Sequence, residues 1–252
     1  MTAFAPDVID ALRQARRVMI FTGAGVSAES GLPTFRDPQQ GLWAKFRPQD
    51  LATPEAFARD PETVWRWYQW RRRVHAGVAP NAAHHAIAAM QSRNPDAALV
   101  TQNVDRLHEL AGSERIIHLH GSVFRNKCAG CGAEMPDVPH DLDAPPRCTR
   151  CGGLCRPDVV WFGESLPQKA WRAATEIAQS AELVLSVGTS ATVYPAAELP
   201  QHAKRAGALV IQINPEPTPL DRIAHNLRGP AGVILPALVD AVWPDAAVSR
   251  PG

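Results

Sequence analysis

Residues 18–28 read VMIFTGAGVSA, and this stretch decides the fold. The five apolar or β-branched residues at 18–22 are typical of a buried strand, and the glycines that follow give a GxGxxA pattern. A turn of this kind brings backbone amides and a helix N-terminus against a pyrophosphate group. Taken alone, the same glycines also fit a tight turn without a ligand, so the interpretation depends on the rest of the chain.

Four further short apolar runs alternate with helical stretches, at residues 97–101, 116–119, 183–187 and 208–213. This alternation predicts an α/β fold with a Rossmann-like, doubly wound parallel sheet. Two stretches interrupt the rhythm, and we expect them to form one smaller zinc-binding domain. The predicted division assigns residues 1–37, 81–123 and 158–252 to the larger domain and residues 38–80 and 124–157 to the smaller one. In the first insertion, Asp60 before Pro61 and a glycine at position 77 predict a helix between them.

The second insertion contains two CxxC pairs separated by 16 residues. This spacing is typical of two knuckles that present four thiolates to one zinc ion, and a four-cysteine site is closed and therefore structural. Zinc binding, on the order of 10–16 kcal/mol in small peptides, would replace the apolar core that this insertion lacks. A fifth cysteine, Cys155, is interpreted as a small, partly buried thiol. The predicted ligands are Cys128, Cys131, Cys148 and Cys151.

Polar triplets follow three of the predicted strands. Open α/β sheets bind ligands at the carboxyl ends of their strands, so these triplets are expected at one crevice. Each triplet by itself is equally consistent with ordinary loop chemistry. Their shared position after a strand favours ligand binding. The residues are Gln102, Asn103 and Asp105 after the second run, Gly188, Thr189 and Ser190 after the fourth, and Asn214, Pro215 and Glu216 after the fifth.

The third run leads into two histidines in the sequence IIHLHG at residues 116–121. His120 stands at the strand end beside a glycine, where an imidazole that titrates near neutrality can act as a general base. His118 is expected to pack deeper, in a structural role. The other histidines, including His84, His85 and His108, are interpreted as structural or surface residues.

Composition excludes several classes of partner. The chain of 252 residues has a net charge of +1, 45% hydrophobic and 20% charged residues, which gives no field to attract nucleic acid or anionic lipid. No apolar run approaches the roughly 20 residues of a membrane span. Five cysteines, four of them in CxxC pairs, fit a reducing compartment. We expect a cytoplasmic monomer that binds neither nucleic acid nor membranes.

Together, the motifs GAGVSAESGLPTFRD, TQNVD, HG, VVWFGE, GTS and NPE with the two CxxC pairs resemble the sirtuin family, from about residue 18 to residue 238. The resemblance implies that the larger domain binds NAD and that NAD and an acyl-lysine side chain of a partner protein meet between the domains. It implies deacylation that consumes NAD: the acyl oxygen attacks the ribose carbon as nicotinamide leaves, and an alkylimidate forms. His120 then deprotonates a ribose hydroxyl, and the products are free lysine and O-acyl-ADP-ribose.

The resemblance also assigns residues. His120 and Asn103 are the expected catalytic residues, and the backbone of residues 159–164, with Val160 and Phe162, is expected to bind the substrate peptide as an added strand. The residues assigned to NAD are Gly23, Ala24, Gly25, Ser27, Phe35, Arg36, Gln102, Asn103, Asp105, Gly188, Thr189, Ser190, Asn214, Pro215, Glu216 and Ala231.

A closer resemblance is to the class III, desuccinylase-like branch, through DLATP at residues 50–54 and YQWR at residues 68–71. Tyr68 and Arg71 share a helix face, and a phenol with a guanidinium can hold a carboxylate. Ala52 matches a small residue that widens the acyl pocket. Without the family, Arg71 would be interpreted as a solvated cation near a helix C-terminus. The expected substrates are acetyl, succinyl and malonyl groups on lysine.

Three other functions would require different sequence features. Mono-ADP-ribosyl transfer could use the same cleavage of NAD, but an intact His120 and the Tyr68 and Arg71 pair argue against it. A sensor without activity would be favoured by loss of His120. A Rossmann dehydrogenase would need an uninterrupted βαβ unit with an acidic residue after its second strand, whereas residues 29–37 interrupt the helix early.

Overall fold

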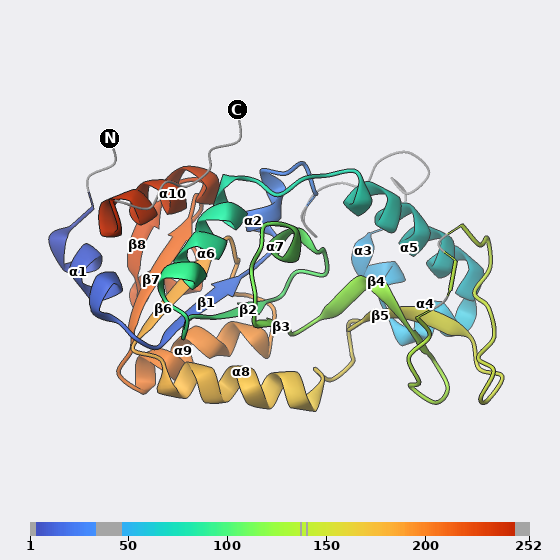
Figure 1. Cartoon of the computed structure of the whole chain (residues 1–252). Coiled ribbons are helices and arrows are strands. Elements are labelled where there is room, and N and C mark those ends of the chain that lie inside the picture. Colours follow the sequence, from blue (N-terminus) through green and yellow to red (C-terminus); the bar gives the residue numbers. More distant parts are fainter. Residues whose placement is uncertain (1–3, 34–46, 137, 140, 245–252) are drawn as a thin grey trace.

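Strand β1 (Val18–Thr22) lies inside a six-stranded sheet of the computed structural model, which describes residues 4–33, 47–136, 138–139 and 141–244 (Figure 1). The strand order is β3-β2-β1-β6-β7-β8, and all neighbours are parallel. The order reverses between β1 and β6, which is the switch point where open α/β sheets form a crevice. The predicted fold class is confirmed. The other strands are β2 (Ala98–Thr101), β3 (Ile116–His118), β6 (Leu183–Val187), β7 (Leu209–Asn214) and β8 (His225–Arg228).

Alternate residues of β1 enter two cores because successive side chains of a strand point to opposite faces. Ile20 packs with α1 (Pro6–Gln14), α6 (Ala82–Arg93) and α10 (Ala231–Val242), which cover one face of the sheet. Phe21 packs with α8 (Gln168–Ser180) and α9 (Leu199–Arg205) on the other face. The two helical layers are visible on either side of the sheet in Figure 1. The sheet is therefore buried on both sides, which explains the continuous apolar runs of its strands.

Strand β8 was not among the apolar runs expected from the sequence. Its residues, HNLR, are half-buried or exposed, and the strand pairs with β7 at the edge of the sheet. Gln212 of β7 donates to Asn226 of β8 across 2.7 Å. An edge strand that uses polar cross-strand contacts shows no apolar run, so hydrophobic periodicity could not detect it.

In the part of the chain that the structure describes, four short helical segments follow strands of the large sheet. Helices α2 (Gly25–Ala28) and α7 (Leu107–Leu110) follow β1 and β2, whereas η2 (Ala196–Glu198) and η3 (Pro219–Arg222) follow β6 and β7. All four lie between strand ends and later elements, so they shape the carboxyl edge of the sheet. Among the helices of the described ranges, none is both long and apolar enough to cross a bilayer.

A smaller part of the molecule lies beside the sheet and contains α3 (Pro48–Leu51), α4 (Pro54–Arg59) and α5 (Pro61–Ala76) (Figure 1). It also contains the antiparallel pair β4 (Gly121–Cys128) and β5 (Cys155–Val159). The predicted helix after Asp60 is confirmed, since the Asp60 carboxylate accepts the Thr63 amide at 3.0 Å. The stretches that form this part come from both predicted insertions, while the domain boundaries themselves stay a prediction.

Aromatic side chains form the core of this smaller part. Trp67 and Tyr68 of α5 are fully buried, and Trp161, which follows β5, is 2% exposed. The guanidinium of Arg72 lies among them and donates to the Val123 carbonyl at 2.6 Å and to the Asn126 side chain. Burial lowers the pKa of Arg72 to about 10. These hydrogen bonds connect α5 to β4. They also satisfy donors of the buried guanidinium, which a buried cation requires.

Candidate active site

The glycine turn after β1 contacts the loop after β6 through backbone atoms. Gly23 donates its amide to the Val187 carbonyl at 3.0 Å, and Gly25 donates to the Gly188 carbonyl at 2.8 Å. A Cβ atom at Gly23 or Gly25 would lie 2.8 Å or 2.7 Å from that same carbonyl oxygen. Any larger residue would push the loops apart at the switch point. This cradle fits the pyrophosphate of a dinucleotide, as the GxGxxA pattern predicts.

Ser27 joins two of the residues expected from the TQNVD motif. Its hydroxyl donates to Asp105 Oδ2 at 2.9 Å and accepts from Asn103 Nδ2 at 3.1 Å. Burial raises the pKa of Asp105, whereas hydrogen bonds from the Leu107 amide and Ser27 oppose the shift. Asn103 Oδ1 is buried and has no hydrogen-bond partner among the described residues. A buried acceptor of this kind needs a donor, and a ribose or amide group of a bound nucleotide would supply one.

The remaining residues expected to bind NAD lie at the same edge of the sheet. Gln102 donates to Thr189 Oγ1 at 3.0 Å, which joins the loops after β2 and β6. Asn214 ends β7, whose Ile213 carbonyl accepts the Gly188 amide at 3.0 Å. Ala231 begins α10 and is 4% exposed. Ala24 is the residue before α2. The Ser190 hydroxyl lies 2.8 Å from the Thr192 hydroxyl. Asn214 donates to the carbonyl of Glu216, which follows Pro215, at 3.0 Å. Phe35 and Arg36 lie outside the described residues.

One contact at this edge has no counterpart among the sequence predictions. The carboxylate of Glu29 accepts the amide of Gly232 at 2.8 Å, in the first turn of α10. A Cβ atom at Gly232 would lie 2.5 Å from Glu29 Oε2, so glycine allows the close approach. The two residues are 203 positions apart in the chain, and no local pattern connects them. Glu29 thereby holds α10 against the glycine turn.

His120 lies between β3 and β4 and faces the loop after β2. Its Nδ1 atom is 3.0 Å from the Gln102 carbonyl, which can only accept, so Nδ1 carries the proton and Nε2 is the free acceptor. Burial lowers the pKa of His120, and the hydrogen bond to Gln102 partly opposes this. The imidazole is therefore neutral at pH 7 and suited to accept a proton. His118 instead bonds Glu109 at 2.9 Å.

Two further histidines lie behind the Ser27 group. The rings of His84 and His108 are 4.8 Å apart and tilted by 60°, and both residues are buried. His108 Nε2 is 3.1 Å from Thr22 Oγ1, and His84 Nε2 is 3.5 Å from Ser27 Oγ. Burial lowers the pKa of His84 to about 4. The sequence predicts structural or surface roles for these histidines, and the structure places both in the interior, next to Thr22 and Ser27.

The residues expected to bind the acyl group come together on the other side of His120. Val160 donates its amide to the His120 carbonyl at 2.9 Å, and Phe162 donates to the Ala52 carbonyl at 2.9 Å. Tyr68 is fully buried, and its hydroxyl accepts from Trp161 Nε1 at 2.9 Å. The segment 160–162 thus connects the base to the predicted acyl pocket.

Arg71 lies in this pocket on the same face of α5 as Tyr68. Its guanidinium carbon is 5.0 Å from the centre of the Trp67 ring and 5.7 Å from that of Tyr68. Burial lowers the pKa of Arg71, while Tyr68 and Asp105 oppose the shift. The side chain is therefore packed against aromatic rings, which differs from the solvated cation that the helix position alone suggested.

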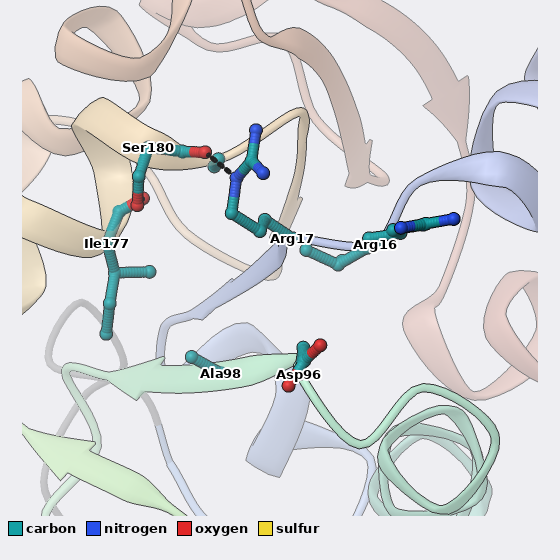
Figure 2. A pocket seen from close by; sticks show the side chains of 8 residues that line it. Arg16, Arg17, Asp96, Ala98, Ile177 and Ser180 are labelled. Atoms are coloured by element: carbon teal, nitrogen blue, oxygen red, sulfur yellow. Dashed lines mark hydrogen bonds between the residues drawn. The ribbon is translucent and has the colours of Figure 1, made fainter.

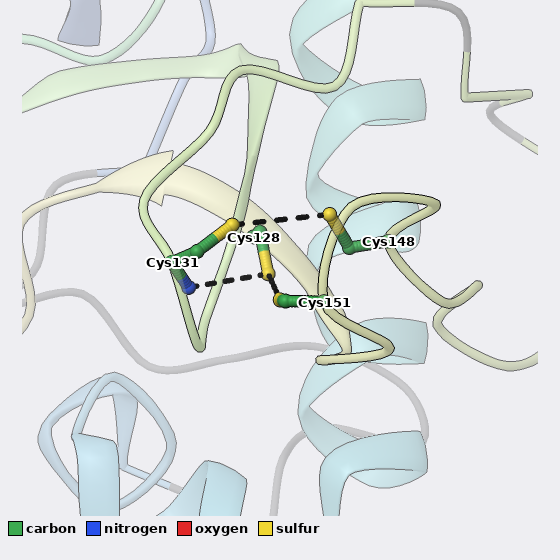
Figure 3. Close-up of side chains that lie close together, drawn as sticks. All are labelled: Cys128, Cys131, Cys148 and Cys151. Carbon is green, nitrogen blue, oxygen red and sulfur yellow. Dashed lines mark hydrogen bonds between the residues drawn. The ribbon is translucent and has the colours of Figure 1, made fainter.

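The four predicted zinc ligands form one cluster at the far end of β4 and β5 (Figure 3). All four sulfur atoms lie within 4.8 Å of one another, with Cys128 and Cys151 3.4 Å apart and Cys131 and Cys148 3.9 Å apart. A tetrahedral zinc with Zn–S bonds of about 2.3 Å separates its sulfurs by about 3.8 Å. The residues therefore fit zinc. Cys155 is fully buried beside the cluster, and burial raises its pKa to about 11.

A cavity of about 420 Å³ lies away from all these loops, at the amino-terminal edge of β1 and β2 (Figure 2). Arg16, Arg17 and Asp96 stand on its rim. Arg17 donates to the Ser180 carbonyl at 2.7 Å and pairs with Glu182 at 2.9 Å. Arg17 is thus engaged in contacts within the protein, and the residues predicted to bind ligands lie at the opposite, carboxyl edge, which remains the candidate site.

Fold and site together define a Rossmann-like α/β protein with a glycine turn at the switch point of its sheet, a buried histidine beside it and a four-cysteine cluster. Residues 23–195 match the Sir2 family. The chain is 52% identical over 238 residues to NAD-dependent protein deacylase 2 of Pyrobaculum aerophilum, which covers 94% of this chain and 95% of that relative. It is 50% identical over 248 residues to the NAD-dependent protein deacylase of Methylococcus capsulatus, covering 95% and 97%. The chain therefore belongs to the Sir2 family, and the expected resemblance is confirmed.

Solved structures agree with this assignment. The crystal structure of a Sir2 homolog–NAD complex has a TM-score of 0.90 and 44% identity, and the match covers 98% of this chain and 96% of that one. A Sir2–p53 peptide–NAD+ structure has a TM-score of 0.83 and 33% identity, with 94% and 98% covered.

Proposed function

We propose that this chain is an NAD-dependent protein-lysine deacylase that removes acetyl groups and the acidic succinyl and malonyl groups. The products are nicotinamide, free lysine and O-acyl-ADP-ribose. Membership of the Sir2 family and about 50% identity to NAD-dependent protein deacylases support the reaction class. The observation that carries the acyl specificity is the position of Arg71 beside the buried Tyr68 hydroxyl.

NAD supplies the electrophilic ribose carbon and is consumed. The residues of this chain position it and handle one proton. The turn at Gly23 and Gly25, which has no side chain to block a close approach, would lie against the pyrophosphate, and the buried Asn103 Oδ1 would accept a hydrogen bond from a ribose hydroxyl or the carboxamide. His120 Nε2 accepts the proton of a ribose hydroxyl, because Nδ1 is already committed to Gln102.

The acyl pocket accommodates a charged end because it offers donors in an apolar wall. A carboxylate can only accept hydrogen bonds, and it loses its hydration when it enters a buried pocket. The Arg71 guanidinium and the Tyr68 hydroxyl compensate this loss with charge-assisted bonds. An acetyl group ends in a methyl, which packs against the same aromatic rings without needing either donor.

A mass-spectrometric assay tests the proposal. Purified protein would be incubated with NAD and matched acetyl-lysine and succinyl-lysine peptides, with His120→Tyr as the blank. We expect NAD-dependent loss of both acyl groups and formation of the corresponding O-acyl-ADP-ribose. ADP-ribose attached to protein, without deacylated peptide, would instead support the mono-ADP-ribosyltransferase alternative.

A further inference from the structure

Trp161 contacts the predicted acyl pocket through one directional hydrogen bond. Its indole Nε1 lies 2.9 Å from the Tyr68 hydroxyl oxygen, and the two ring centres are 6.4 Å apart. An indole nitrogen donates and never accepts, whereas a phenol does both. The Tyr68 oxygen is therefore the acceptor in this bond. Its own proton therefore points away from Trp161 and can be donated to a third group.

The position of Trp161 is determined by contacts on all sides. Its ring packs on Phe57, with centres 5.3 Å apart, and the Arg156 guanidinium carbon is 3.2 Å from its ring centre. Its backbone amide donates to Glu164 Oε2 at 2.8 Å, and Arg156 holds that carboxylate at 2.9 Å. Cation–π contact and a paired carboxylate together leave the indole little freedom. The N–H vector is thus set before any substrate arrives.

We infer that Trp161 is a positioning residue for acidic acyl groups, because its indole N–H occupies the Tyr68 oxygen and directs the phenol proton toward the acyl carboxylate beside Arg71. The inference rests on the proposed acidic-acyl specificity and deepens it. A phenol that donated its proton within the protein would present only lone pairs to the carboxylate and would repel it. Trp161 prevents the phenol from donating in its direction, because an indole nitrogen cannot accept a hydrogen bond.

The chemistry of Tyr68 agrees with this role. Burial raises the pKa of Tyr68, so the phenol stays protonated and acts as a donor throughout the neutral range. Acetyl-lysine gains nothing from the arrangement, since its methyl end has no acceptor for the phenol proton. Trp161 should therefore affect succinyl and malonyl substrates selectively.

Trp161→Phe tests the inference, since phenylalanine keeps an aromatic ring but removes the N–H donor. We expect KM for a succinyl-lysine peptide to rise about five- to tenfold, the scale of one directed hydrogen bond, with kcat little changed. Deacetylation should change less than about twofold. Trp243→Phe is the matched control, because Trp243 packs at the edge of the sheet core away from the pocket.

A double-mutant cycle asks whether Trp161 acts through Tyr68. Tyr68→Phe removes the shared oxygen, and in that background Trp161→Phe should produce no further change in the succinyl-to-acetyl ratio. A spectroscopic readout accompanies it: the indole N–H resonance that is missing in Trp161→Phe should shift in Tyr68→Phe. In the unsubstituted protein it should shift with a succinyl-lysine peptide more than with an acetyl-lysine peptide.

Several outcomes overturn the inference. Equal losses on both peptides in Trp161→Phe would show that the ring only supports the fold, as would an indole resonance that ignores Tyr68→Phe. An effect that persists in the Tyr68→Phe background would show that Trp161 acts by another route. If Trp161→Phe fails to fold, the indole resonance is assigned in the unsubstituted protein through the backbone resonances of residue 161, and its responses to Tyr68→Phe and to the two peptides decide. Failure of the proposed function looks different: Tyr68→Phe and Arg71→Met would then leave the succinyl-to-acetyl ratio unchanged.

Discussion

At the scale of single residues, burial would set the pH range in which His120, the proposed base, can work. The imidazole loses hydration inside the site, so its protonated form is disfavoured and its pKa falls below the ordinary 6.5. The hydrogen bond from Nδ1 to Gln102 limits this fall and leaves Nε2 as the acceptor. Burial therefore favours the neutral form of His120, and the hydrogen bond to Gln102 determines which ring nitrogen carries the proton.

A pH profile checks this. A base is active when deprotonated, so kcat/KM should fall as pH drops through the His120 pKa, and the midpoint of the acidic limb should lie below 6.5. The measurement is deacetylation of a neutral acetyl-lysine peptide at limiting substrate, from about pH 5 to pH 8. A midpoint at or above 6.5 would contradict the assigned effect of burial.

Arg71 carries the second prediction at this scale. Arg71→Met keeps much of the apolar stem but removes the charge, so desuccinylation should lose roughly 10- to 100-fold in kcat/KM, the value of a charge-assisted contact in a buried site. Deacetylation should stay within about threefold. Arg66→Met is the control, because Arg66 is on the exposed side of α5 and pairs with Glu62 at 3.5 Å. Equal loss of both activities would refute the carboxylate role.

At the scale of elements, the start of α10 depends on a residue from the opposite end of the chain. Pro230 precedes α10 and gives it no side-chain cap, and the Glu29 carboxylate bonds the Gly232 amide instead. A carboxylate at a helix N-terminus also interacts favourably with the helix dipole. This contact fixes the distance between the glycine turn and Ala231, the residue expected beside the adenosine half of NAD.

Glu29→Ala should therefore weaken both the helix and the site. We expect a loss of about 1 kcal/mol of unfolding free energy, seen as a fall of about 2–4 °C in Tm, and a several-fold weaker affinity for ADP-ribose by calorimetry. Glu176→Ala, at an exposed position of α8, should change neither. Weaker binding without any fall in stability would point to a direct contact between Glu29 and the nucleotide.

At the scale of the whole molecule, the larger and the smaller part are each stabilised by a different interaction. The sheet buries apolar side chains on both faces, whereas the cysteine end of β4 and β5 depends on the four-thiolate cluster. Removing zinc should therefore destabilise the smaller part and leave the apolar cores of the sheet unchanged. Ala52 and Tyr68 of the proposed acyl pocket belong to the aromatic core of the smaller part.

Removal of zinc should loosen one part alone. After treatment with a strong chelator, hydrogen exchange should accelerate in peptides spanning residues 121–159 while β1 and β6 stay protected. Cys148→Ser should behave in the same way, and Cys155→Ala should retain one zinc per chain by elemental analysis. Uniform acceleration across the molecule would show that the two parts unfold together.

Much of the fold and of the site could be predicted because the signals are local. Strand β1, the glycine turn, the CxxC pairs and the helix after Asp60 each depend on residues a few positions apart, where periodicity and turn chemistry act directly. The expected cofactor residues follow strands, so a parallel sheet places them at one edge. Strand β8 could not be predicted, because its polar residues at the edge of the sheet form no apolar run.

The sequence by itself determined the five apolar strands of the sheet, the zinc ligands and the chemical types gathered at the crevice. Only the tertiary structure decided which distant polar groups touch. Trp161 and Tyr68 are 93 positions apart, and Glu29 and Gly232 are 203 apart. A hydrogen bond acts over about 3 Å, so such pairs arise only after the packing of helices and strands has brought their segments together.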